Sequence, residues 1–82
     1  MVKFRVVILD DSDNIQEVIY ESKVYEKDNI FDWCNDYYHL LHELNKKYDL
    51  DDYDNAPYLE TQILEEDVWH FHSNTIEDWF NI

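Results

Sequence analysis

Two segments near the amino terminus have the character of β-strands. Residues 2–9 alternate between two faces at the period of a strand, residues 15–25 are rich in β-branched and aromatic side chains, and the turn-forming residues 10–14 separate them. Because successive side chains of a strand point to opposite sides, the alternation defines a buried and an exposed face. The pattern predicts an antiparallel hairpin, and its expected core face comprises Phe4, Val6, Ile8, Val18 and Tyr20.

The turn sets the register of this hairpin. If Leu9 pairs with Ile15 across the turn, every later pair follows by counting along both strands. The expected pairs are then Val6 with Val18, Phe4 with Tyr20, and Lys3 with Glu21.

The segment from Asn29 to Lys47 has the pattern of an amphipathic helix. Asn29 is a suitable N-cap, Asp32 lies near the positive end of the helix dipole, and Lys46 and Lys47 lie near its negative end. Apolar residues recur at spacings of three and four, which gathers them on one side of the helix. The stripe comprises Ile30, Cys34, Tyr37, Leu41, Leu44 and Tyr48. We expect this helix to lie across the sheet.

The chain changes character after Lys47, because residues 48–82 contain ten Asp and Glu side chains and neither Lys nor Arg. Asn74, with Glu77 three residues later, resembles a capping box and predicts a short terminal helix. The other expected elements are an acidic loop at 49–57, strands at 58–64 and 68–72, and a turn at 65–67. The sequence therefore predicts one α+β domain over residues 1–82, an antiparallel sheet of about four strands with one amphipathic helix packed on it.

Composition removes most familiar enzyme classes. The chain has no glycine, so it lacks the phosphate loop, the dinucleotide fingerprint, the nucleophile elbow and the calcium hand. Its 20 Asp and Glu against 6 Lys and Arg give a net charge of −14, which argues against direct binding to nucleic acid or to an anionic membrane. Fourteen aromatic residues supply enough apolar surface for a folded core. We therefore expect a folded protein with a cationic partner.

Cys34 is the only cysteine, so no intrachain disulfide can form and a reducing compartment is expected. We expect its side chain to be a small buried apolar group. No stretch approaches the roughly 18 to 20 apolar residues of a membrane span, and the amino terminus is too short and too alternating for a signal peptide. These features favour a cytoplasmic protein.

Histidines occur in two pairs, His39 with His42 on the predicted helix and His70 with His72 on the predicted fourth strand. Two such pairs resemble a zinc ligand set, but nothing in the spacing brings them together, so we expect no metal and no cofactor. Carboxylates are too abundant for any pair to indicate acid–base catalysis, and no serine or cysteine has the context of a nucleophile. We expect no enzymatic activity.

The acidic residues are arranged in rows and clusters. On the exposed half of the predicted helix, Asp32 and Asp36 are separated by about 6 Å of helix rise, which is of the same order as the charge spacing along a nucleic-acid backbone. Trp69 or Tyr53 is expected to serve as an aromatic anchor. The predicted partner-binding residues are Asp32, Asp36, Glu43, Asp49, Asp51, Asp52, Tyr53, Asp54, Glu65, Glu66 and Asp67.

In size and composition the chain resembles a class of phage-encoded nucleic-acid mimics: anti-CRISPR proteins, anti-restriction proteins and uracil-DNA glycosylase inhibitors. The resemblance rests on a small, strongly acidic, glycine-poor chain rich in Tyr and Asn. It implies stoichiometric inhibition of a basic nucleic-acid-binding protein of the host, in the cytoplasm of an infected bacterium. It carries over no role for any single residue.

Two alternatives stay open beside this hypothesis. In the first alternative, the protein is an interaction module or a homodimer that uses the apolar helix flank around Phe31, Trp33 and Tyr38. In the second, it is an allosteric inhibitor that binds its target outside the nucleic-acid groove. A merely solubilising surface is the plainest interpretation of the charge, but such surfaces carry a net charge of about 2 to 8 with both signs interspersed. The imbalance here is larger.

Repulsion among the carboxylates subtracts from the stability of a chain this small. Because added salt screens such repulsion, we expect the melting temperature to rise with ionic strength. Thermal unfolding followed by circular dichroism at low and at high salt checks this, and a melting temperature that stays constant or falls would contradict it.

Overall fold

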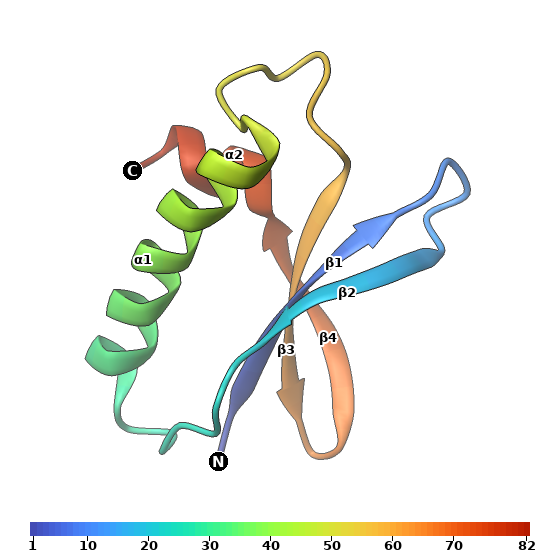
Figure 1. The fold of residues 1–82 in the computed structure, drawn as a ribbon. Coiled ribbons are helices and arrows are strands. Elements are labelled where there is room, and N and C mark those ends of the chain that lie inside the picture. Colours follow the sequence, from blue (N-terminus) through green and yellow to red (C-terminus); the bar gives the residue numbers. More distant parts are fainter.

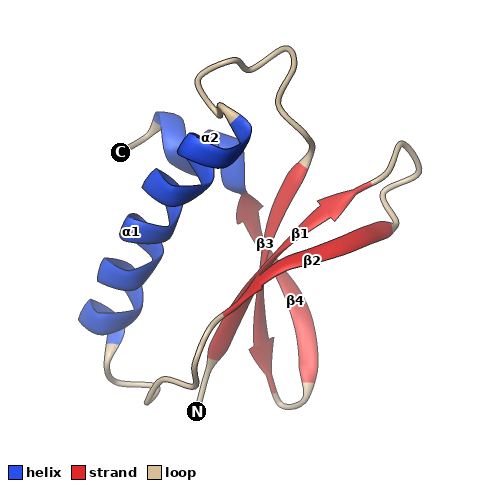
Figure 2. Ribbon diagram, in the orientation of Figure 1, coloured by secondary structure: helices blue, strands red, loops and turns tan.

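Four strands form one antiparallel sheet, in the spatial order β2-β1-β3-β4, and two helices lie on one side of it (Figures 1 and 2). The computed structural model describes residues 1–82. The elements are β1 Lys3–Leu9, β2 Ile15–Glu21, α1 Ile30–Tyr48, β3 Leu59–Glu65, β4 Val68–Asn74 and α2 Thr75–Phe80. The α+β class and the order of elements are those that the sequence predicts.

The register of the first hairpin differs from the prediction. Leu9 does pair with Ile15, but Val6 pairs with Tyr20, and Val18 lies opposite Val7. The pairing shifts between Val6 and Val7 and again between Ile8 and Leu9. Each shift is a β-bulge, which places an extra residue in one strand and cannot be counted from an alternating pattern.

The bulges also change the predicted core face. Phe4 and Val6 are fully buried and Ile8 and Tyr20 are partly buried on the side of the helices. Val18 instead pairs with Val7 on the other face of the sheet and is 44% exposed. The prediction that Val18 belongs to the core was therefore wrong.

Phe4 is the centre of an aromatic cluster between β1 and α1. Its ring stacks on Tyr20 and Tyr25 and meets the rings of Trp33 and Tyr37 edge-on, with centroid distances of 5.2 to 6.1 Å. Such arrangements add roughly 0.5 to 1.5 kcal/mol per pair beyond the burial of area. This cluster fixes the middle of α1 on the sheet.

A second cluster joins every layer of the fold. It consists of five buried residues from β1, α1, the loop after α1, β3 and α2, namely Val6, Leu44, Leu50, Leu59 and Ile76. Leu50 follows α1 directly, where Asp49 adopts a left-handed conformation and donates its N–H to the carbonyl of Asn45. This helix ending turns the chain back so that Leu50 enters the core.

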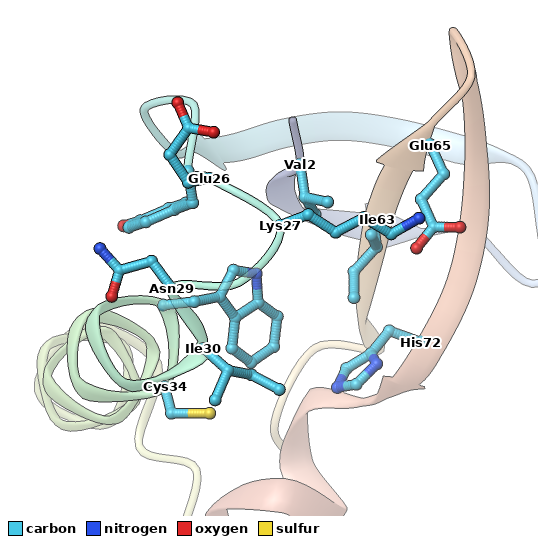
Figure 3. A pocket seen from close by; sticks show the side chains of 11 residues that line it. Val2, Glu26, Lys27, Asn29, Ile30, Cys34, Ile63, Glu65 and His72 are labelled. Carbon is cyan, nitrogen blue, oxygen red and sulfur yellow. The ribbon is translucent and has the colours of Figure 1, made fainter.

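The amino-terminal part of α1 is not packed as its apolar stripe predicts. Tyr37, Leu41 and Leu44 are buried, whereas Ile30 is 63% exposed and Cys34 is also exposed. A cavity separates this end of α1 from the sheet (Figure 3). The expectation of a buried Cys34 was wrong because the sheet lies across a cavity from this end of α1 and does not pack against it.

The two predicted N-caps behave differently. Asn74 caps α2, since its Oδ1 accepts a hydrogen bond of 3.0 Å from the N–H of Ile76. Asn29 precedes α1 but makes no such bond, and its amide donates to Asp32 instead. The first turn of α1 therefore has no side-chain cap at Asn29.

Replacement of Leu50 tests whether the loop residue holds the layers together. Leu50→Ala removes a fully buried side chain, and we expect a loss of about 2 to 5 kcal/mol in the free energy of unfolding. Ile30→Ala, at the exposed end of α1, should change it by no more than about 0.5 kcal/mol. Urea denaturation measures both; equal effects would contradict the assignment of Leu50 to the core.

Candidate functional site

A row of carboxylates follows the outside of α1 and continues into the loop after it. Helix α1 has 19 residues and spans about 28 Å at 1.5 Å per residue. Figure 1 shows the loop at the carboxyl end of this helix. The side chains in this row are exposed. We call this set the acidic surface; it comprises Asp32, Glu43, Asp49, Asp51, Asp52 and Asp54.

Asp36 lies on α1 as predicted but is partly buried and is held by a neighbouring side chain. Its carboxylate accepts a hydrogen bond of 2.6 Å from the hydroxyl of buried Tyr25, and Asp36 is itself half-buried. Burial, together with this bond, raises the pKa of Tyr25 well above its usual range. The prediction that Asp36 projects freely into solvent was therefore wrong.

The acidic loop is anchored at Asp51. Its carboxylate accepts hydrogen bonds from Trp79 Nε1 at 2.7 Å and from Asn45 Nδ2 at 3.2 Å, and its N–H donates to Asn45 Oδ1. These contacts tie the loop to both helices. Tyr53 is 58% exposed and its ring lies 5.9 Å from that of Phe80. The loop therefore presents its remaining carboxylates from a fixed position.

The cluster Glu65, Glu66 and Asp67 does not join this surface. It lies at the turn between β3 and β4, at the end of the molecule opposite the acidic loop (Figure 1). Trp69, the other expected anchor, is also elsewhere, because it stacks on Arg5 on the sheet face away from the helices. The predicted residues thus form two separate acidic regions.

Basic side chains interrupt the acidic row only at the end of α1. Lys46 and Lys47 lie in its last turn, and Lys46 Nζ is 3.8 Å from Glu43 Oε1. Both side chains of this pair are more than 70% exposed, so the ion pair contributes little and leaves Glu43 available to a partner.

Sequence reasoning missed Asp78, a partly buried carboxylate that holds two hydroxyl groups. It accepts hydrogen bonds from the hydroxyls of Tyr37 and Ser73, and Tyr37 is bonded in turn to Thr61, which contacts Thr75. This network joins α1, β3, β4 and α2. Nothing in the spacing distinguishes Asp78 from an ordinary acid in the first turn of a helix, so no sequence signal could have found it.

Burial raises the pKa of Tyr37 well above its usual range, and its hydrogen bond to Asp78 acts in the same direction. The hydroxyl therefore stays protonated and remains a donor to Asp78. A buried network of this kind stabilises one arrangement of the helices because all its members are satisfied.

A cavity of about 500 Å³ lies between the amino-terminal end of α1 and the sheet (Figure 3). Its walls are mainly apolar and include Ile30, Trp33 and Ile63, and Lys27, Glu65 and His72 also line it. Cys34 and His72 both point toward this space in Figure 3. Its size is in the range of small-molecule sites, but its lining contains no hydrogen-bonded polar cluster that would select a ligand.

The histidines are distributed among aromatic contacts. His42 lies between the rings of Tyr38 and Trp79, with centroid distances of 4.8 and 5.0 Å. His72 meets Trp33 edge-on at 5.4 Å. No group of three or more His, Cys, Asp or Glu side chains is arranged to hold a metal ion.

Comparisons with protein-family models, with curated proteins and with solved structures found no match to this chain. Neither helix has the length and apolar character needed to span a membrane. The charge, shape and exposed side chains of the molecule are therefore the observations that bear on its function.

The network at Asp78 predicts a loss of stability at alkaline pH. The unfolded chain releases the Tyr37 proton near pH 10, whereas the folded protein retains it, so stability falls as the pH rises above about 10. Tyr37→Phe should cost about 1 to 3 kcal/mol at neutral pH, because Asp78 loses a donor. Its difference from the wild type should shrink toward pH 11, as measured by urea denaturation; a constant difference would contradict the coupling.

Proposed function

We propose that this protein is a non-catalytic inhibitor that binds the cationic nucleic-acid-binding site of a host defence or repair protein, such as a CRISPR nuclease or a restriction system, by imitating the charge of DNA. One observation carries the proposal. A net charge of −14 over a length of 36 Å gives one charge per about 2.6 Å, against one per about 1.7 Å along duplex DNA. A groove lined by Lys and Arg would meet a comparable field on this protein.

The backbone conformation supports a specific role for the charge. Four residues have φ between 52° and 64°, namely Asp13, Asp49, Glu66 and Asp67. Gly, Asn and Asp tolerate this left-handed region, so Glu66 is the exception among the four. All four carboxylates add charge to the turns of a molecule that already repels itself. The turns therefore contribute to the charge that the proposed function would use.

The anchoring of the acidic loop supports the same proposal. Asp51 is fixed by Trp79 and Asn45, so less conformational freedom is lost when the loop meets a partner. Asp52 and Asp54 project from this anchored segment as exposed groups. A rigid charge array of this kind imitates a duplex better than a flexible acidic tail does.

One observation favours the alternative of an apolar interaction module. Phe31 is 86% exposed on the flank of α1 and adjoins exposed Ile30. Exposed large apolar side chains that adjoin one another are typical of protein-binding surfaces. Complexes formed through this flank would be insensitive to salt, whereas complexes formed through exposed charge would weaken steeply at high ionic strength.

A charge-removal variant tests the proposal. Asp32→Asn, Glu43→Gln, Asp49→Asn and Asp54→Asn together remove four exposed charges from the acidic surface without changing side-chain shape. A target is captured from bacterial lysate and purified. We expect this variant to fold as the wild type does and to bind the target at least about tenfold more weakly. We also expect duplex DNA to compete with the wild-type protein for the target. Calorimetric titration measures both effects.

The matched control removes four charges elsewhere, by Asp11→Asn, Asp13→Asn, Glu17→Gln and Glu26→Gln. It should retain most of the affinity, because three of these residues lie in the β1–β2 hairpin, away from α1. An equal loss in both variants would mean that only total charge matters. Salt-sensitive binding without competition by DNA would favour an allosteric inhibitor, and binding that ignores salt would favour the apolar flank.

A further inference from the structure

The face of the sheet turned away from the helices has a character unlike the rest of the molecule. Neither helix covers it (Figure 2), and register places the side chains of Val7, Gln62 and Phe71 there. The charged residues that its strands contribute are Lys3, Arg5, Glu21 and Glu60. Their charges sum to zero in a protein whose net charge is −14. We call this surface the outer face.

The polar side chains of the outer face hold one another in place. Arg5 Nε donates to Gln62 Oε1 at 2.8 Å, and its guanidinium lies 4.1 Å from the ring centroid of Trp69. Gln62 in turn donates to Glu60, and Lys3 forms an ion pair of 3.0 Å with Glu21. The long side chains are therefore already ordered, so their burial against a partner costs less conformational entropy.

Apolar groups on the same face remain exposed. Phe71 is 68% exposed and Val18 is 44% exposed. Beside Phe71, a hollow of about 430 Å³ is lined by Tyr58 and Asn74 and by the carboxylates Glu60 and Glu77. The outer face thus offers a projecting aromatic ring next to a recess, and Trp, Phe and Arg are the residue types enriched at protein interfaces.

We propose that the outer face binds a second copy of this chain in a twofold-symmetric dimer. Two molecules of charge −14 repel each other across most orientations, and a face on which the strand charges sum to zero gives the least repulsion at close contact. A twofold axis places the same patch on both partners, so that Phe71 of one copy can enter the hollow of the other. The cationic partner proposed above would be attracted to the acidic surface rather than to this face, because the strand charges here cancel.

This inference does not depend on the proposed inhibitor function, and it differs from self-association through the α1 flank around Phe31, which the sequence indicates. In the dimer both sets of helices point outward. The acidic surface of each copy stays exposed, and one dimer presents two such surfaces to its targets.

Sedimentation equilibrium of the full chain, from about 10 µM to about 1 mM, tests the dimer. The mass should rise with concentration from 10.2 kDa toward twice that value. Association should be stronger at about 500 mM salt than at about 50 mM, because salt screens the remaining repulsion between copies. Binding to a cationic target has the opposite salt dependence, so the two proposals fail independently.

Two serine variants locate the contact. Phe71→Ser removes the exposed ring from the outer face, and Phe31→Ser removes a still more exposed ring from α1. We expect Phe71→Ser to weaken dimerisation at least about tenfold and Phe31→Ser to leave it unchanged, with circular dichroism confirming that both variants fold.

Several outcomes would overturn the proposal. A wild-type mass of 10.2 kDa at every concentration would show that the chain does not dimerise and that the outer face does not bind a second copy. An effect of Phe31→Ser equal to that of Phe71→Ser would move the contact to the helix, and masses that grow beyond a dimer would indicate open-ended association rather than a closed twofold interface.

Discussion

Burial of β1 is the interaction on which the rest of the structure depends. Phe4 and Val6 are fully buried against the helices, and Val7 is fully buried on the opposite side. Both neighbours, β2 and β3, pair with this one strand. Because β1 supplies four of the eleven buried hydrophobic residues and contributes to both core clusters, its burial is a large part of what offsets the repulsion among the carboxylates.

The absence of glycine has a structural consequence that reaches the surface. At turns and helix ends that need a left-handed backbone, the chain has to use a residue other than glycine. Here every such position holds Asp or Glu. Asp49 ends α1, and Glu66 with Asp67 makes the tight turn between β3 and β4. The residues that form these turns therefore also place negative charge on them. Fold and surface charge are not independent in this protein.

The molecule has two surfaces of opposite character on the two sides of one sheet. The helical side carries the acidic surface and the anchored loop, whereas the strands of the outer face carry equal numbers of positive and negative side chains together with Trp69 and Phe71. Carboxylates are also used inside, since Asp36 and Asp78 hold tyrosine hydroxyls rather than facing solvent. The acidic composition therefore serves several physical roles, and only the exposed part is available to a partner.

The sequence by itself determined the order of the elements, the helix from Asn29, the acidic loop and the Asn74 cap, because periodicity and capping are local properties. Only the tertiary structure decided which residues those elements bury. The register shift between Ile8 and Leu9 moved Val18 to the outer face, the cavity between α1 and the sheet left Cys34 exposed, and the hydroxyl of Tyr25 holds Asp36 in a partly buried position. Each of these outcomes depends on contacts between residues that are distant in the chain. A local sequence pattern does not show which distant residues come together. For the same reason the neutral outer face could not be foreseen, since its charges cancel only when β1, β2 and β3 lie side by side.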